Sequence, residues 1–360
     1  MAPAKPQAAR AVLEDVVKRF GQTVALDGVS LTVEPGELVT LLGPSGCGKT
    51  TALRILAGLE TVTAGRVFIG DAVVTHLPPN ARDLTMVFQS YALFPHLSVF
   101  ENVAYGLRVL RRPEAEVRQA VREVLGLVGM PGLEGRSPSA LSGGQQQRVA
   151  VARALVLKPK VLLFDEPLSN LDAKLRKHMR AEIRSLQQRL GITALYVTHD
   201  QAEALAISDR IAVMEAGRIR QLGRATDIYA RPATRFVADF IGEANFLPAR
   251  VTAVTDGTAE IEALGRRWTI RARGFAAGAA VVLVVRPEAI AVGPPSRGRF
   301  AGEVTTSTYL GGEVYYDLAV QGASLQARVM MAGDAPAYRA GDRVGVDVIE
   351  GSLHIVPREG

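Results

Sequence analysis

The stretch from Gly43 to Thr50 constrains this chain more than any other part of its sequence. It reads GPSGCGKT and fits the P-loop pattern G-x-x-x-x-G-K-[ST] at every position. An apolar, strand-like run precedes it at residues 37–42, and a helical run follows at residues 51–57. In this order, glycines let several backbone N–H groups converge on one phosphate at the positive end of the helix dipole. The sequence therefore predicts a phosphate-binding loop, and a glycine-rich turn without a ligand is the alternative.

The residues of this loop have different expected roles in a nucleotide site. Lys49 is expected to reach the β- and γ-phosphates, and the hydroxyl of Thr50 is expected to bind Mg²⁺. Cys47 is the single cysteine of the chain, so an internal disulfide is excluded and packing inside the loop is expected. The predicted nucleotide-binding residues of the loop are Gly43, Pro44, Ser45, Gly46, Cys47, Gly48, Lys49, Thr50 and Thr51.

A second apolar run, residues 161–164, ends on two acidic residues, Asp165 and Glu166. Such a run is typical of a parallel strand covered on both faces, and ligands of open α/β sheets bind at the carboxyl ends of strands. Asp165 is predicted to hold Mg²⁺ directly or through water, and Glu166 to polarise the attacking water as a general base. An ordinary helix start with two acidic residues is the alternative.

A third motif, LSGGQ, covers residues 141–145 and precedes a stretch with helical periodicity at residues 146–156. Ser142 is therefore predicted at a helix N-terminus, beside Gly143 and Gly144. This arrangement would be a second phosphate-binding device in the same chain. Ser-Gly-Gly alone occurs in many loops, so its weight depends on the other motifs.

The motifs follow one another in a specific order: the P-loop, Gln89, LSGGQ, Asp165-Glu166, Asp172 and His199. Over roughly residues 10–240 this series resembles the ATP-binding subunits of ABC transporters. The resemblance implies ATP and Mg²⁺ as ligands. It also implies that Gln89 contacts Mg²⁺ or its water and senses a membrane partner, and that His199 touches the γ-phosphate. A packed or solvated side chain is the alternative for His199, as for the other histidines.

The same resemblance assigns the remaining site residues. Phe20 occupies the place where these proteins stack an aromatic ring on adenine, and a core phenylalanine is the competing explanation. In the family the two phosphate-binding devices face opposite ways, so two copies must pair head to tail, with Asp172 at the dimer seam. The expected catalytic residues are Glu166, His199 and Gln89, the Mg²⁺ ligands are Thr50, Gln89 and Asp165, and the nucleotide contacts outside the P-loop are Phe20, Ser142, Gly143, Gly144, Gln145 and Asp172.

Composition and patterning divide the chain of 360 residues into parts. We expect a flexible N-terminus at residues 1–11 and an α/β P-loop ABC ATPase domain at 12–241. Residues 12–34 alternate apolar and polar, as antiparallel strands do. Helical runs at 99–111 and 113–127 resemble the helical subdomain of the family, at about residues 90–145.

Beyond Gly242, short β-like runs separated by glycine-bearing turns predict a small all-β, OB-like barrel at residues 242–360. It resembles the C-terminal accessory (TOBE-like) domain of importer ATPases, most clearly at residues 285–288. Some barrels of this shape bind oligonucleotides. The net charge is +6, but no basic run exceeds Arg111-Arg112, so no nucleic-acid partner is expected.

The resemblance predicts the energy-coupling ATPase of an ABC importer, at the cytoplasmic face of the inner membrane. Its partners would be a second copy of itself, two integral-membrane permease subunits and, indirectly, a periplasmic solute-binding protein. The longest apolar stretch, residues 275–285, is too short to span a bilayer, so an exporter half with fused membrane helices is not expected. Nor is a signal peptide expected at the N-terminus. A soluble ABC-type ATPase acting on DNA or ribosomes would generally carry a coiled-coil insert or two ATPase units.

Two finer hypotheses concern partner and cargo. Tyr91, Phe94 and His96 directly follow Gln89 and are expected to line the groove for a short permease helix, although an ordinary loop is the alternative. The stretch at residues 240–247, FIGEANFL, favours polyamine (spermidine/putrescine) import first and ferric-iron import second. Phosphonate and sugar importers share the overall pattern.

Overall fold

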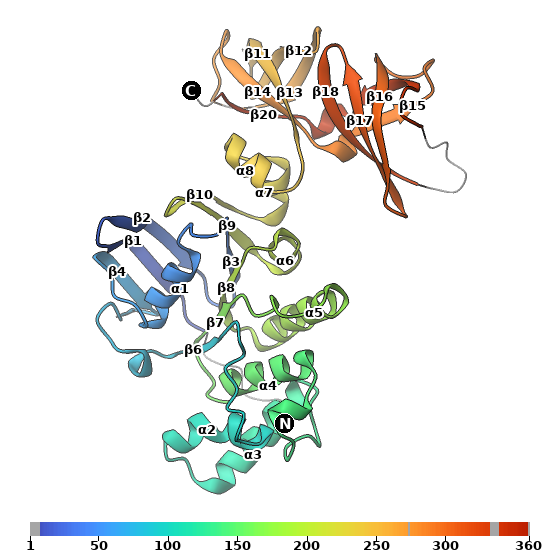
Figure 1. Cartoon of the computed structure of the whole chain (residues 1–360). Coiled ribbons are helices and arrows are strands. Elements are labelled where there is room, and N and C mark those ends of the chain that lie inside the picture. The colour runs from blue at the N-terminus through green and yellow to red at the C-terminus, as the bar shows by residue number, and fades with distance from the viewer. Residues whose placement is uncertain (1–7, 273, 332–337, 359–360) are drawn as a thin grey trace. The chain divides into compact units, whose positions relative to one another are not determined.

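The computed structural model describes residues 8–272, 274–331 and 338–358 (Figure 1). The chain divides into two compact units, Met1–Ala225 and Thr226–Gly360. Of the segment expected to be flexible, residues 1–7 lie outside the described residues. Arg10 pairs with Asp71 at 3.1 Å, and Ala11 already begins the first strand.

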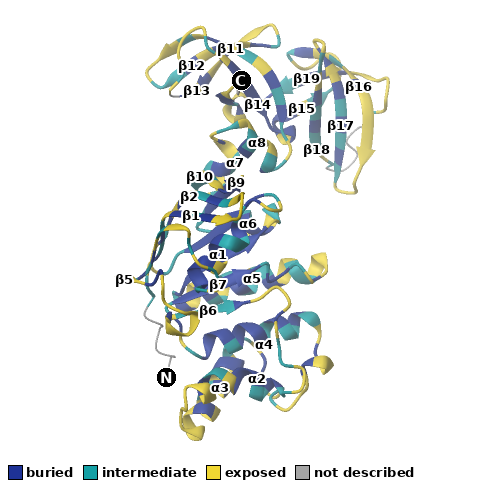
Figure 2. Ribbon diagram, turned by 60° about the vertical axis from the view of Figure 1, so that its left-hand side comes forward, coloured by how far each residue is buried: buried dark blue, intermediate teal, exposed yellow. Residues whose placement is uncertain are grey.

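The first unit is built on a six-stranded sheet in the order β10-β9-β3-β8-β7-β6. Five of these strands run parallel, and β10 pairs antiparallel with β9. Every residue of β3, β7 and β8 is buried, because helices and a second sheet cover both faces (Figure 2). The strands are β3 (Leu38–Leu42), β6 (Leu84–Val87), β7 (Val161–Asp165), β8 (Thr193–Thr198), β9 (Arg210–Glu215) and β10 (Arg218–Gly223).

A second, antiparallel sheet of the first unit has the order β2-β1-β4-β5. It shares an apolar core with α1 (Lys49–Ala57) and with the large sheet. The prediction of antiparallel strands over residues 12–34 is confirmed by β1 and β2. The strands are β1 (Ala11–Phe20), β2 (Thr23–Val33), β4 (Ala64–Ile69) and β5 (Ala72–Val73).

Helices α2 (Val99–Val109) and α3 (Glu114–Leu127) confirm the two predicted helical runs. They pack with α4 (Gly143–Leu155) into a helical subdomain whose core continues under α5 (Ala173–Leu190). A short helix, α6 (Gln201–Ile207), follows β8. Two 3-10 turns, Pro79–Ala81 and Pro138–Ala140, lie in the connections. None of the helices in the described ranges is both long enough and apolar enough to cross a bilayer.

The second unit contains two five-stranded antiparallel sheets, ordered β13-β12-β11-β14-β20 and β15-β19-β16-β17-β18. In the second of these, edge strands β15 and β18 approach each other, so the sheet curls into a nearly closed barrel. The predicted all-β, OB-like domain is therefore confirmed. The strands are β11 (Asn245–Thr255), β12 (Thr258–Ala263), β13 (Arg266–Arg271), β14 (Ala280–Val285), β15 (Ile290–Gly293), β16 (Phe300–Tyr309), β17 (Glu313–Val320), β18 (Ala323–Met330), β19 (Arg343–Val348) and β20 (His354–Pro357). Two further 3-10 turns are Pro287–Ala289 and Glu350–Ser352.

The division between the units falls at the start of α7 (Ala225–Ala230), not at 241/242 as the sequence indicated. The next helix, α8 (Arg235–Phe240), packs Ala238 on β14 and β20. The buried guanidinium of Arg286 donates to the carbonyls of Ala238 at 2.8 Å and Tyr229 at 3.1 Å. These contacts make the two short helices part of the barrel unit.

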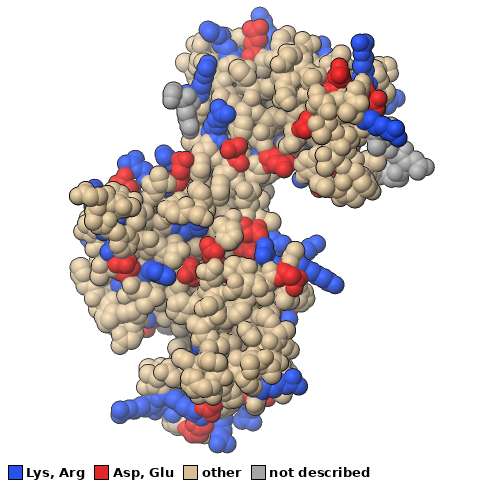
Figure 3. Space-filling model, viewed as in Figure 1, with Lys and Arg blue, Asp and Glu red and all other residues tan. Residues whose placement is uncertain are grey.

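Charged side chains of both signs are dispersed over the face drawn in Figure 3. On the face drawn in Figure 3, Lys and Arg alternate with Asp and Glu on both units. The excess of 42 Lys and Arg over 36 Asp and Glu is therefore not gathered into one continuous basic surface on that face.

Candidate nucleotide site

The P-loop connects β3 to α1, and steric constraints explain two of its glycines. Gly48 has a φ of 106°, and a Cβ there would lie 2.5 Å from the carbonyl oxygen of Ala25. A Cβ on Gly43 would lie 2.3 Å from the carbonyl oxygen of Met214. At Gly46, whose φ is 78°, no heavy atom lies within 4 Å of the Cβ position. The loop is thus closed against neighbouring backbone at its ends and open at Gly46.

Lys49 points back into the loop. Its ammonium donates to the carbonyls of Gly43 at 2.7 Å and Pro44 at 2.9 Å, and the side chain is buried. Thr50 and Thr51 follow in the first turn of α1, both partly exposed. Burial raises the pKa of the Cys47 thiol, although Lys49 opposes this, so the neutral thiol is favoured. The expectation that Cys47 packs inside the loop is confirmed.

Phe20 lies at the end of β1 with 47% of its surface exposed. The ammonium of Lys18 is 4.7 Å from the centre of the ring and is held by Glu60 at 2.7 Å. The competing explanation, a core phenylalanine, is therefore wrong. An exposed ring at a strand end can offer one face to a planar ligand.

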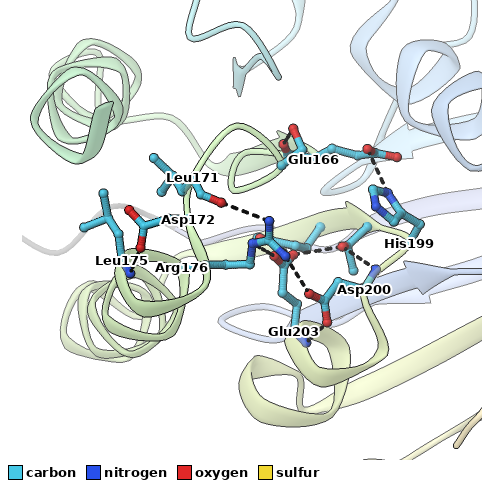
Figure 4. Close-up of polar contacts among 11 residues, drawn as sticks. Glu166, Leu171, Asp172, Leu175, Arg176, His199, Asp200 and Glu203 are labelled. Carbon is cyan, nitrogen blue, oxygen red and sulfur yellow. Dashed lines mark hydrogen bonds and ion pairs between the residues drawn. The ribbon is translucent and has the colours of Figure 1, made fainter. Parts of the chain in front are cut away.

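Two acidic residues lie at the carboxyl end of β7. Asp165 is buried, and this burial, together with the charge of Glu166, raises the pKa of its carboxyl against the opposing effect of Arg54. Glu166 has a φ of 43°, and its N–H donates to Val197 on β8 at 3.0 Å. Its carboxylate lies 3.0 Å from Nδ1 of His199 (Figure 4). The structure thus brings two predicted site residues from different strands into direct contact.

The side chains predicted to bind Mg²⁺ fit a hard cation, because all of them present oxygen. Asp165 is a buried carboxylate whose protonation a nearby cation would oppose, Thr50 offers a hydroxyl, and Gln89 is exposed just after β6. Among the described residues, no group of three or more His, Cys, Asp or Glu side chains could hold a metal ion. Mg²⁺ would therefore need phosphate oxygens and water as its other ligands.

Ser142 is the N-cap of α4, as predicted. It forms a capping box, in which its N–H donates to Gln145 Oε1 at 3.0 Å and its hydroxyl accepts from the Gln145 N–H at 3.4 Å. A Cβ on Gly143 would lie 3.1 Å from Leu171, and one on Gly144 would lie 3.1 Å from Leu175. The LSGGQ motif is therefore packed against the loop that carries Asp172 in its own subunit.

Asp172 is the N-cap of α5, where its carboxylate accepts from the N–H of Leu175 at 2.9 Å. Sequence reasoning missed the neighbouring Arg176, Asp200 and Glu203, which form a charged cluster beside it (Figure 4). The spacing of Asp200 and Glu203 is that of a helix N-cap and its third residue, a signal that the sequence carried. Arg176 lies in a different helix, and no local pattern points to it.

Tyr91 corrects one expectation about the segment after Gln89. Its ring is only 6% exposed and belongs to the apolar core, so Tyr91 does not line an open groove. The reason is the backbone turn, with a φ of 61° at Tyr91, whose carbonyl is held by Arg153 at 2.8 Å. Phe94 and His96 remain at least partly exposed, with their ring centres 6.1 Å apart.

Known proteins are similar to this chain over most of its length. The family model described as ABC transporter matches residues 26–169, and the TOBE domain model matches residues 283–356. The chain is 56% identical to the Fe(3+) ions import ATP-binding protein FbpC of Brucella abortus, over 87% of this chain and 88% of that protein. It is 50% identical to the spermidine/putrescine import ATP-binding protein PotA of Rubrobacter xylanophilus, over 95% and 92% of the two chains.

A solved structure has the same fold as the first unit. It is a dimeric, post-hydrolysis form of the ATP-binding cassette MJ0796 bound to ADP and Pi. Its TM-score is 0.53 and its sequence identity 32%, and the match covers 60% of this chain and 98% of the cassette. The ABC transporter model spans the P-loop, LSGGQ and Asp165-Glu166, and the TOBE model lies within the barrel unit. This chain belongs to the family of ATP-binding subunits of ABC importers, which are ATPases.

Proposed function

We propose that this chain is the ATPase subunit of a ferric-iron importer. The observation that supports ferric iron as the cargo is the 56% identity to the FbpC protein over 87% of the chain. Polyamine import, which the sequence favoured first, becomes the second candidate, supported by the 50% identity to the PotA protein over 95% of the chain. The higher identity favours ferric iron.

For hydrolysis, we assign the base to Glu166 because of its contact with His199. In the doubly protonated ring of His199, Nδ1–H would donate to the carboxylate and hold it in place, and Nε2–H would donate to the γ-phosphate. Glu166 would then accept the proton of the attacking water. Lys49 would turn from the loop carbonyls to the phosphates, and Phe20 would stack on adenine. Bound Mg²⁺, held by Thr50, Gln89 and Asp165, would neutralise charge on the phosphate oxygens.

Two copies of the chain would form the working unit. In this arrangement ATP lies between the P-loop of one copy and Ser142 to Gly144 of the other, so that closing the pair converts ATP binding into motion. The dimeric MJ0796 cassette bound to ADP and Pi supports this proposal. The pair would act on two permease subunits at the cytoplasmic face of the inner membrane.

The first test is Glu166→Gln in the full chain, which keeps the shape of the side chain and removes its basicity. We expect ATP binding to persist, steady-state turnover to fall by about 10²–10⁴ fold, and an ATP-bound dimer to accumulate. Glu116→Gln, at an exposed position on α3, is the control and should leave all three unchanged. Substantial turnover by the Glu166 variant would reject it as the base.

The cargo requires the reconstituted complex. ATPase activity is measured with the permease subunits in liposomes and either a ferric-loaded or a polyamine-loaded binding protein. Stimulation by the ferric-loaded protein alone is expected. Stimulation by the polyamine-loaded protein alone would reverse the assignment of cargo.

Contact with the permease is proposed at Phe94 and His96. Phe94 also packs on the exposed Tyr105, with ring centres 4.8 Å apart, so this part of the surface presents aromatic rings. In a Cys47→Ser background, a cysteine at position 96 should cross-link to a cytoplasmic loop of the permease. The proposal would be contradicted if the cysteine at position 96 cross-linked to other parts of the complex but not to a cytoplasmic loop of the permease.

A further inference from the structure

Arg176 bridges two loops that meet at the candidate site (Figure 4). It lies in the first turn of α5, and its guanidinium donates to the carbonyl of Leu171 at 2.9 Å. It also donates to the carboxylate of Asp200 at 3.3 Å. One side chain therefore joins the loop that carries Asp172 to the turn that carries His199.

Each end of this bridge continues into the site. Leu171 packs against Gly143 of the LSGGQ motif, because a Cβ there would lie 3.1 Å from it. Asp200 directly follows His199, whose Nδ1 lies 3.0 Å from the carboxylate of Glu166. A continuous series of contacts thus runs from LSGGQ through Arg176 to Glu166 inside one subunit.

Arg176 also lies just beyond hydrogen-bond distance of a third residue, Glu203. Arg176 Nε lies 3.9 Å from the carboxylate of Glu203 and has no hydrogen-bond partner among the described residues. An ordinary N–H···O bond is about 2.9 Å long, so a shift of about 1 Å would complete it. Glu203 is almost fully buried and is held by Thr198 at 2.8 Å and Tyr196 at 3.1 Å. It is therefore a fixed acceptor toward which Arg176 can move.

We infer that Arg176 is a positioning residue that conveys the placement of LSGGQ and the Asp172 loop to the Glu166–His199 pair. The inference rests on the proposed function, in which LSGGQ contacts the nucleotide of the other copy. When that nucleotide is seated, Leu171 moves Arg176 toward Glu203, and Asp200 carries His199 with it. Hydrolysis in one subunit then depends on the ATP bound against its own LSGGQ motif, which is the molecular basis of cooperativity between the two sites.

The test compares Arg176→Met with Asp200→Asn in the full chain. Methionine keeps an apolar stem without the guanidinium, and asparagine keeps the N-cap of α6 while removing the charge. For both we expect kcat to fall about tenfold, ATP affinity to stay within about twofold, and the Hill coefficient for ATP to fall toward about 1. Lys177→Met removes an exposed cation from the next position of α5 and should change none of these values.

If Arg176 had a purely structural role, Arg176→Met and Asp200→Asn would have lower thermal stability and lower kcat but unchanged cooperativity. That result would overturn the inference. The double variant should be no slower than the slower single one, because both remove the same contact, whereas additive losses would contradict it. Arg176→Lys should restore part of the cooperativity, since its ammonium reaches one partner but lacks the fork. If Arg176→Met does not fold, Asp200→Asn decides alone.

The proposed function is tested separately by the wild-type chain and Glu166→Gln. If the wild type hydrolyses ATP cooperatively, Glu166→Gln is inactive and Arg176→Met is still cooperative, only the role of Arg176 is refuted. If the wild type does not hydrolyse ATP, the proposed function fails first.

Discussion

Replacing Gly48 or Gly46 by alanine should separate backbone strain from steric overlap in the P-loop. At Gly46 only the φ of 78° opposes a side chain, because the Cβ position has no heavy atom within 4 Å. The left-handed conformation costs an L-residue about 1–2 kcal/mol, and the loss of unfolded-state freedom returns about 0.4–1 kcal/mol. Gly46→Ala should therefore lower the free energy of unfolding by about 1 kcal/mol.

At Gly48 strain and overlap add. The φ of 106° lies further from allowed geometry and costs about 1–3 kcal/mol. The new Cβ would lie 2.5 Å from the Ala25 carbonyl and 2.7 Å from the Leu26 side chain. Since the carbonyl belongs to strand β2, the strand itself must shift, which costs about another 1–3 kcal/mol. With the same return of about 0.4–1 kcal/mol from the unfolded state, Gly48→Ala should lower the free energy of unfolding by about 3 kcal/mol, roughly three times the effect of Gly46→Ala.

The assay uses the division of the chain into two units. Trp268, the single tryptophan, is buried in the barrel unit, so its fluorescence follows that unit. Far-ultraviolet circular dichroism mainly follows the helices of the first unit. Each kcal/mol should move the melting temperature of a unit of this size by about 2–4 °C. We expect the Gly48 variant to lower the circular-dichroism transition by about 6–12 °C and leave the Trp268 transition in place. Equal shifts for the two alanine variants would refute the steric argument.

Three further outcomes follow from other parts of the first unit. Lys49→Ala should weaken ATP binding at least about tenfold, because a charged contact to phosphate is lost, and unchanged affinity in a nucleotide titration would reject its role. Phe20→Ala should weaken ATP binding by about 1 kcal/mol and Phe20→Trp should not, whereas equal affinities of all three proteins would exclude stacking. Burial alone would raise the pKa of the Asp209 carboxyl, but the bonds from Arg184 and from the Leu38 N–H outweigh burial and lower that pKa. The charged carboxylate therefore stabilises the fold above the unfolded pKa, and this stabilisation is lost as pH falls through the folded pKa. Asp209→Asn should thus cost about 1–3 kcal/mol at pH 7 in urea unfolding, with a gap to wild type that narrows below about pH 4; a gap independent of pH would contradict this.

Features that depend on neighbours in sequence were predictable. The P-loop is defined by a strand, glycines and a helix within a short segment, and the structure has all three. The N-cap role of Ser142 follows from the residues just after it, and its capping box with Gln145 is present. The alternating pattern of residues 12–34 likewise identified β1 and β2.

Features that depend on distant contacts were not predictable. Arg176 and Asp200 are 24 positions apart, and only the packing of α5 beside α6, which Asp200 caps, brings their side chains together. Tyr91 looked like an exposed aromatic beside Phe94 and His96, but a left-handed turn directs its ring into the core. The short helix α8 carries no mark of which unit it joins, because its apolar face is complementary to strands that come later in the chain.

The hydrogen bonds from Arg286 to the carbonyls of Tyr229 and Ala238 determine where this chain can be divided and recombined. A truncation after Ile241 would separate Ala238 from the strands that cover it, and would leave the carbonyl of Tyr229 without its guanidinium donor. A join placed before α7 keeps Arg286 and all of its acceptor carbonyls in the same piece of the chain. Chimeras that exchange the barrel between transporter ATPases should therefore be spliced after Gly223, where the last strand of the nucleotide unit ends. The two short helices α7 and α8 would then be transferred together with the barrel to which they are bonded.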